Sequence, residues 1–183
     1  VVSTPETNPH QAALFGKVWL RGTRFATEET IEAGFDQGIF VDLLPYDALS
    51  SDPATAAKQR RDCRFCQSVS YLSHAKSIVV PHKGALGAIE RAACGAAHLA
   101  ARGLYSPEKI VSRFNKAATC GNDPSLASDD LVVMAYATYE PYARSMMLPT
   151  STVTFEGCEF PAPADPEAFL RQLYGQLQRE SEG

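Results

Sequence analysis

The sequence predicts one globular domain of the α/β or α+β class that spans residues 1–183. Two observations support this prediction. The chain is 45% hydrophobic and 21% charged, a balance that suits one domain with a sizeable core and does not favour a second full domain. Short β-prone runs also occur between longer stretches with helical spacing, so both kinds of element are expected.

The charge and cysteine content narrow the functional classes. The formal net charge is −4, from 17 basic and 21 acidic residues, so no broad attraction to nucleic acid is expected. The most apolar helical stretch, residues 92–101, is interrupted by His98, and we expect no transmembrane segment. The first residues lack the pattern of a signal peptide. Five cysteines in a chain too long to need disulfides favour a reducing, cytoplasmic location.

The first quarter of the chain reads as a loop followed by β structure. Residues 4–10 contain two prolines and an asparagine, which predict a loop. Residues 13–20 are β-prone, and a tight turn at Arg21 and Gly22 would lead into residues 23–25, giving a basic hairpin. The glutamate-rich stretch that follows is most simply a connecting loop or a short helix.

An acid stands in the middle of the next apolar run, residues 38–47. An isolated carboxylate is costly to desolvate, so Asp42 is expected to be paired, hydrogen-bonded or bound to a cation. Pro45 cannot continue a central strand, so the strand should end close to Asp42 and place it near the edge where open α/β sheets build their sites. Two interpretations remain equally open: a functional carboxylate, or one that caps a turn or pairs with an arginine.

Three helices are expected in the middle of the chain. Asp52 and Pro53 have the form of a helix start, and the helical pattern continues to about His74. A second helix should cover residues 83–102, with glycines that suggest close packing and Gly103 at its end. A third should run from the cap at residues 106–107 to about residue 118.

The C-terminal third should contain a buried strand, a hairpin and a helix. Residues 131–134 are short, apolar and β-prone. Residues 152–160 predict a hairpin with Gly157 in its turn, and an amphipathic helix should begin at Pro166 and fray from Arg179 onward. Residues 136–144 have no clear assignment.

Two other patterns have a structural and a functional interpretation. Cys63 and Cys66 form a lone Cys-x-x-Cys motif on a helix face, where core packing explains them better than a zinc site lacking a second ligand pair. Tyr136, Tyr139 and Tyr142 recur every three residues, which suits core packing better than an aromatic pocket for a quaternary ammonium group. The four histidines show no metalloenzyme spacing.

Four motifs in order resemble those of the LicD family of phosphocholine-type transferases. The matches are residues 3–10 with 15–17 and 22–25, residues 38–47, residues 155–157 with 160–163, and Leu170 with residues 173–175. The resemblance spans nearly the whole chain and implies an α+β, nucleotidyltransferase-like mixed sheet flanked by helices. The family's glycine-rich segment with its Asp-x-Asp carboxylates should lie before Val1, so the fold is expected to be incomplete at its N-terminus.

The resemblance also implies an activity, that of a transferase of phosphorus-containing groups. Such an enzyme moves phosphocholine or a related substituted phosphate from a CDP-activated donor to a hydroxyl of a cell-surface glycan such as lipopolysaccharide or teichoic acid. It implies Mg²⁺ or Mn²⁺ as the cofactor, a CDP-choline-like donor and a glycan acceptor as partners, and a place in the cytoplasm or at the inner face of the membrane. A sugar or polyol phosphate is the alternative group transferred.

The resemblance assigns roles to three residues. Asp42 would be a site carboxylate that completes the metal shell or accepts the proton of the attacking hydroxyl. Lys17 and Arg24 are the candidates for diphosphate contacts, against the simpler interpretation of a solvated hairpin face. Asp47 is expected to be a turn residue. By itself the chain should show little turnover, and the alternative function is a truncated or degenerate, non-catalytic scaffold that binds a glycan or a partner.

Overall fold

The protein is described by a computed structural model that covers residues 1–27, 30–31, 34, 37–74, 84–136 and 138–181. Its residues cluster into two compact units. Unit 1 comprises Val1–Pro45 and Arg61–Ala117, and unit 2 comprises Tyr46–Arg60 and Ala118–Gly183. Helices and antiparallel sheets occur together, which confirms the α+β class. One domain over residues 1–183 stays a prediction.

The expected mixed sheet is not formed by the described residues. Their strands build three small sheets, and every strand pair in them is antiparallel. The described strands are short, with two to six residues each. Asp42 lies near the end of its strand, as expected, but the sheet around it is a small antiparallel one and not an open α/β sheet.

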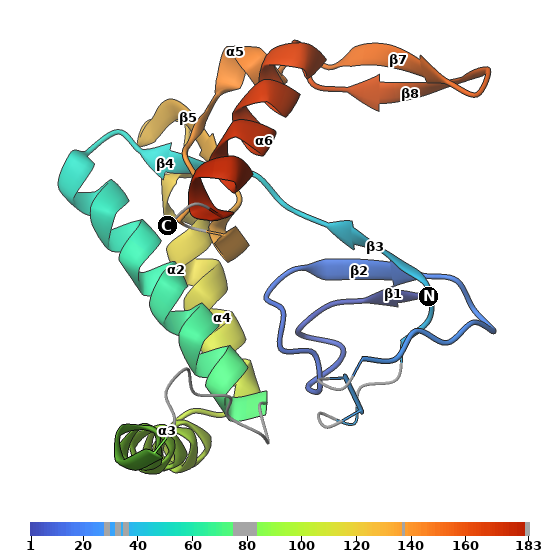
Figure 1. The fold of residues 1–183 in the computed structure, drawn as a ribbon. Coiled ribbons are helices and arrows are strands. Elements are labelled where there is room, and N and C mark those ends of the chain that lie inside the picture. The colour runs from blue at the N-terminus through green and yellow to red at the C-terminus, as the bar shows by residue number, and fades with distance from the viewer. Residues whose placement is uncertain (28–29, 32–33, 35–36, 75–83, 137, 182–183) are drawn as a thin grey trace. The chain divides into compact units, whose positions relative to one another are not determined.

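The sheet of unit 1 contains β1 (Val2–Ser3), β2 (Gly16–Trp19) and β3 (Phe40–Leu43), with β2 in the centre (Figure 1). In its register Lys17 lies opposite both Ser3 and Asp42. Residues directly opposite one another in antiparallel strands point to the same face. Ser3, Lys17 and Asp42 consequently form one row across the sheet.

The predicted basic hairpin does not form. Gly22 does adopt a turn conformation, with φ of +80°, but the residues after it are not a strand. The neighbours of β2 are β1 and β3 instead, and the backbone N–H of Phe25 donates to the carbonyl of Gln37 at 2.8 Å. Phe25 is thus hydrogen-bonded to the segment that leads into β3, and residues 23–25 do not pair with β2. Glu28, Glu29 and Glu32 lie outside the described residues.

Strand β3 is an edge strand rather than a buried central one. Asp42 is in this strand and Pro45 follows its end, both as expected. The face of the sheet opposite Asp42 carries exposed apolar side chains. Val41 keeps 69% of its surface exposed and Leu43 keeps 47%. Val2 and Val18 extend this exposed face across the sheet. We expect an exposed apolar surface of this kind to favour self-association.

The three middle helices are confirmed. They are α2 (Pro53–His74), α3 (Gly84–Leu104) and α4 (Pro107–Ala118). Asp52 caps α2, since its Oδ2 accepts hydrogen bonds from the backbone N–H of Thr55 at 2.8 Å and from the Thr55 hydroxyl. These bonds hold the pKa of Asp52 below its ordinary value. Helix α2 begins in unit 2 and ends in unit 1.

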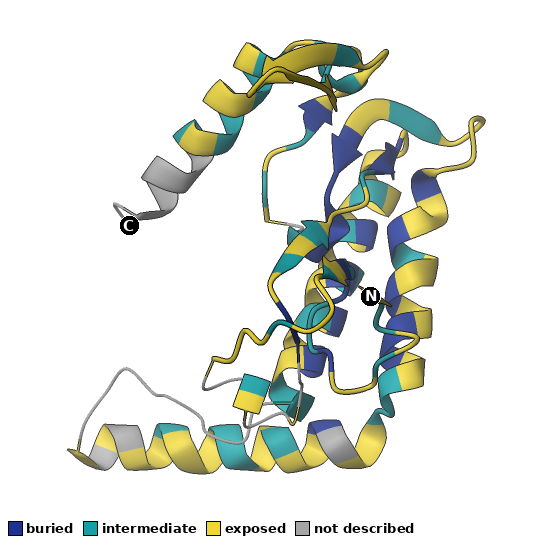
Figure 2. Cartoon of the chain, turned by 90° about the vertical axis from the view of Figure 1, so that its right-hand side faces the viewer, coloured by how far each residue is buried: buried dark blue, intermediate teal, exposed yellow. Residues whose placement is uncertain are grey.

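The glycines of α3 do not have the expected roles. Gly103 lies within the helix rather than at its end. A Cβ atom built at Gly84 or Gly95 would meet no atom within 4 Å, so the prediction that these two positions pack closely was wrong. Figure 2 shows exposed residues along much of this helix.

Helices α2 and α4 supply much of the core of unit 1. Cys63 and Cys66 are 0% and 1% exposed, and the next turn adds buried Val69. Helix α4 contributes Ile110 and Phe114. The packing interpretation of the Cys-x-x-Cys motif is confirmed, and no group of three potential metal ligands occurs within the described parts of the chain.

Alkylation of the native protein should distinguish the cysteines by burial. Burial raises the pKa of the Cys66 thiol, which lowers its thiolate fraction at neutral pH. Cys120 and Cys158 are exposed. We expect iodoacetamide to label Cys120 and Cys158 first, with Cys63 and Cys66 reacting at comparable rates only in denaturant, as read by peptide mass spectrometry. Fast native labelling of Cys66 would show that α2 and α4 do not pack as described.

Unit 2 contains a second three-stranded sheet, a hairpin and short helical elements. The sheet has the order β4 (Asp47–Ser50), β5 (Ala127–Val132) and β6 (Tyr142–Ala143). The remaining elements are η1 (Thr119–Gly121), η2 (Met134–Tyr136), α5 (Arg144–Met147), β7 (Ser151–Phe155), β8 (Cys158–Ala162) and α6 (Pro166–Ser181). The predicted C-terminal hairpin and helix are confirmed, with Gly157 in the turn at φ of +77°.

A polar cluster joins β4 to its neighbours in unit 2. The side-chain amide of Gln59 donates to the carbonyls of Ala48 and Ala118, and its oxygen accepts from the backbone N–H of Ser50. Asp47 is buried in β4 and accepts a 2.7 Å hydrogen bond from the side-chain amide of Asn122. The expectation that Asp47 is a turn residue was wrong. Asp47 is a strand residue, and the hydrogen bond from Asn122 compensates for the burial of its carboxylate.

The expectation concerning membranes agrees with the structure. Among the described residues, no helix combines the length and the apolar character needed to cross a bilayer.

Candidate functional site

The candidate site is built on the ion pair between Lys17 and Asp42. The two residues are direct partners in the register of β2 and β3, and Lys17 Nζ lies 2.8 Å from Asp42 Oδ1. The lysine side chain is 11% exposed and the aspartate side chain 33%. The pair is therefore half-buried, with the carboxylate on the more accessible side.

Two aromatic rings surround the lysine ammonium. Lys17 Nζ lies 3.7 Å from the ring centroid of Phe40 and 5.3 Å from that of Phe15. A cation near the face of an aromatic ring is stabilised by the ring quadrupole, more strongly where water is excluded. Phe40 reaches this position because it precedes Asp42 by two residues and shares its face of β3. The rings and the carboxylate together hold the ammonium in one place.

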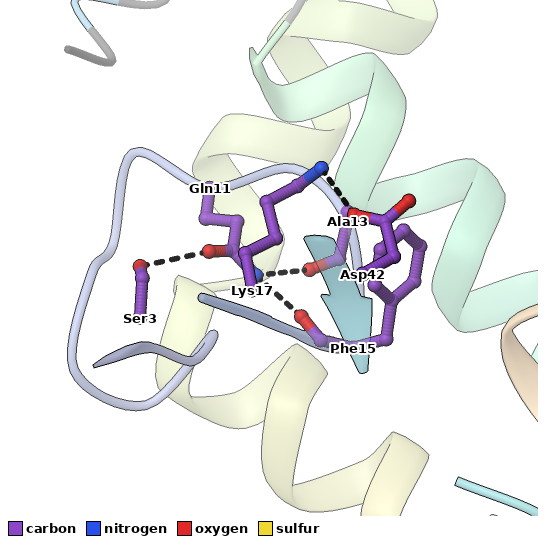
Figure 3. Close-up of polar contacts among 6 residues, drawn as sticks. All are labelled: Ser3, Gln11, Ala13, Phe15, Lys17 and Asp42. Carbon is purple, nitrogen blue, oxygen red and sulfur yellow. Dashed lines mark hydrogen bonds and ion pairs between the residues drawn. The ribbon is translucent and has the colours of Figure 1, made fainter. Parts of the chain in front are cut away.

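Hydrogen bonds of Ser3 and Gln11 support the same row of the sheet. The Ser3 hydroxyl donates to the side-chain oxygen of Gln11 at 2.9 Å, and the Gln11 amide donates to the carbonyls of Ala13 and Phe15 (Figure 3). Ser3 and Gln11 are each 3% exposed. These bonds fix the loop that leads into β2 and, with it, the start of the strand that carries Lys17.

The pair retains unused hydrogen-bonding capacity. A lysine ammonium has three N–H donors and an ionised carboxylate has two acceptor oxygens. Within the described residues the side-chain hydrogen bond of each group is the one they share, between Nζ and Oδ1. Asp42 Oδ2 and two donors of Lys17 thus make no side-chain hydrogen bond with the described residues, and the lysine side chain is 11% exposed.

The structure brings together two of the three predicted site residues. Asp42 and Lys17 form the pair, so the interpretation that Asp42 has a cationic partner is confirmed with lysine in place of arginine. Arg24 is exposed in the coil after Gly22, and since residues 23–25 are not a strand it does not share a hairpin face with Lys17. Its role as a phosphate contact stays a prediction.

Four residues of the site were not predicted as site residues from the sequence, namely Ser3, Gln11, Phe15 and Phe40. Phe40 had a usable signal, because its spacing of two from Asp42 places both on one face of a strand. Ser3 and Gln11 lie in or beside a loop and carry no spacing that would have indicated their contact.

The aromatic pocket suggested by the tyrosine spacing is not formed. The rings of Tyr136 and Tyr139 stack on each other with centroids 5.3 Å apart. Tyr142 is instead buried between Tyr46 and Phe169, at 5.8 and 5.0 Å. Core packing explains the third tyrosine, and the three rings do not converge on one ligand.

The described residues do not fit a Mg²⁺ or Mn²⁺ site around Asp42. These ions need several hard oxygen ligands in near-octahedral geometry. The site offers one carboxylate, and one of its oxygens already accepts from the Lys17 ammonium. No other acidic residue groups with Asp42 in the described parts of the chain. Mg²⁺ or Mn²⁺ as the cofactor stays a prediction.

No protein-family model, curated protein or solved structure matches the chain.

Proposed function

We propose that the chain belongs to a phosphotransferase of the LicD type and that the Lys17–Asp42 pair lies in its phosphate-transfer site. The observation that carries the proposal is the direct pairing of Lys17 and Asp42 across β2 and β3, with Asp42 Oδ2 and two ammonium donors unused within the described chain. The ordered resemblance of four motifs to that family, from which these roles of Lys17 and Asp42 come, also supports it.

In this proposal each member of the pair has a separate role. Lys17 binds an oxygen of the donor's diphosphate and offsets the charge that develops on it. Asp42 accepts the proton of the acceptor hydroxyl through Oδ2, while that hydroxyl's oxygen forms a bond to phosphorus and the bond from phosphorus to the cytidine monophosphate oxygen breaks. The donor is CDP-choline or a related CDP-activated compound, and the acceptor is a glycan hydroxyl.

A second candidate function is supported by the way in which Lys17 is paired and covered. Lys17 is neutralised by Asp42 at 2.8 Å and covered by two aromatic rings, an arrangement that also suits a purely structural pair. The chain would then be a non-catalytic scaffold that binds a glycan or a partner.

Calorimetric titration with CDP-choline distinguishes the two functions. We expect saturable binding that weakens about tenfold in Lys17→Gln, because a charge-assisted hydrogen bond to phosphate is lost. Arg21 is an exposed cation near the end of β2 and provides the matched control, so Arg21→Gln should bind like the wild-type chain. Equal affinities of the wild-type chain and Lys17→Gln, or the absence of any binding, would favour the scaffold.

A further inference from the structure

A cavity of about 360 Å³ lies within unit 2, at the base of the β7–β8 hairpin. Its volume is in the range of small-molecule sites, near the lower end. Its lining includes the apolar residues Leu131, Met147 and Pro161 and three residues with polar side chains, Tyr46, Arg144 and Thr150. The cavity contains neither Lys17 nor Asp42, so a ligand site there is independent of the proposed function.

The walls of the cavity are held together by contacts within unit 2. The backbone N–H of Ala164 donates to the carbonyl of Met147 at 3.3 Å, which ties α5 to the segment after β8. The hydroxyl of Ser151 donates to the carbonyl of Pro163 and closes the base of the hairpin. The ring of Tyr46 packs edge-on against buried Tyr142. The cavity is thus formed by the fold before any ligand binds.

Arg144 gives the cavity its charge. Its guanidinium forms no ion pair with any carboxylate that the structure describes, in contrast to Arg171 of α6, which pairs with Glu167 at 2.7 Å. Asp165, two residues after the lining residue Pro163, is engaged in capping α6 through the backbone N–H of Ala168. A guanidinium at the wall of an apolar cavity favours an anionic group that can accept two parallel hydrogen bonds.

The neighbouring hydroxyls add donors rather than negative charge. Burial, with a smaller effect from Tyr142, raises the pKa of Tyr46 to about 12, so its hydroxyl stays protonated at neutral pH. Thr150 contributes a second hydroxyl at the exposed end. A ligand that accepts hydrogen bonds from Arg144, Tyr46 and Thr150 carries several acceptor atoms at one end.

We propose that this cavity is a binding site for a small molecule that joins a carboxylate or phosphate to an apolar body, with Arg144 holding the anionic head and Leu131, Met147 and Pro161 contacting the body. Carboxylate and phosphate share the geometry that the guanidinium recognises. Two probes, phenylacetate and phenyl phosphate, distinguish a carboxylate ligand from a phosphate ligand. Uncharged 2-phenylethanol tests whether binding requires the anionic group.

The test is titration of the ¹⁵N-labelled full chain with each probe, followed by two-dimensional NMR. We expect one of the anionic probes to shift the amide signals of Arg144, Met147 and Ala162 saturably, and 2-phenylethanol to bind about tenfold more weakly or not at all. Arg144→Gln should weaken the anionic probe about tenfold, and Arg144→Lys should weaken it less because the charge remains.

Arg171→Gln makes the same charge change on an exposed helix of the same unit and should leave the affinity unchanged. Since each spectrum also reports the fold, loss of binding by unfolding would be visible directly. Equal binding by the wild-type chain and by a folded Arg144→Gln would overturn the proposal. So would the absence of saturable shifts around the cavity with both anionic probes at millimolar concentrations.

Discussion

Gly121→Ala should be the most destabilising single substitution considered, with a loss of at least about 3 kcal/mol in the free energy of unfolding. A Cβ atom at this buried position would clash with the carbonyl oxygen of Ala48 and would lie 2.7 Å from backbone atoms of Leu49 and Ser50. These atoms belong to β4 and cannot turn away as a flexible side chain would. Either η1 or β4 must move, which disturbs the hydrogen bonds that Gln59 makes with Ala48 and Ser50 of β4 and with Ala118 next to η1.

Gly95→Ala in α3 is the matched control for this substitution. Its Cβ would meet nothing within 4 Å, and alanine is the better helix former, so a gain of about 0.5–1 kcal/mol is expected. Urea unfolding followed by circular dichroism measures both variants. If Gly121→Ala unfolded at the same urea concentration as the wild-type chain, the close contact between η1 and β4 would be incorrect.

Removal of Asp42 should have the second-largest effect, because it leaves the Lys17 ammonium poorly solvated. Truncating one member of a fully buried pair costs about 3–5 kcal/mol. Asp42 is one-third exposed, so about 1–2 kcal/mol is expected for Asp42→Ala. Lys17→Met should cost less, since the replacement still packs on Phe40 and leaves a carboxylate that water can reach.

A double-mutant cycle separates this pair from an ordinary surface pair. With Lys17 already replaced by methionine, removal of Asp42 should have little further effect, giving a coupling of about 1 kcal/mol. Arg171 and Glu167 on α6 provide the control, because both side chains are exposed and their coupling should be close to zero. Equal coupling in both cycles would mean that Lys17 and Asp42 interact no more strongly than solvated charges.

Local signals predicted most of the elements correctly. Helix α2 has a strong cap at Asp52, and the hairpin turn contains Gly157, a residue that adopts positive φ without strain. Such features depend on a few neighbouring residues and are readable from the sequence. The two cysteines of α2 were likewise placed in the core from their helical spacing alone.

The pairing of distant strands was not predictable in the same way. Lys17 was assigned a partner strand at residues 23–25, although its true partner, Asp42, lies 25 residues along the chain. The nearer pairing has the shorter loop, but the hydrogen bonds of Leu20 and Phe25 to residues 39 and 37 favour the longer connection. Asp47 was misassigned for a similar reason, because its partner, Asn122, is 75 residues away.

The most direct test of the central claim, that Lys17 and Asp42 bind and transfer a phosphate-bearing group, is an NMR measurement on the Lys17 side chain. The ¹⁵Nζ–¹H signal of Lys17, assigned from its absence in Lys17→Gln, is followed while CDP-choline is added to the full chain. The proposed site predicts a saturable shift of this signal, with the same dissociation constant as calorimetry gives. A signal that stays in place while CDP-choline binds elsewhere, or that never moves because nothing binds, would contradict the claim and leave the pair with a structural role alone.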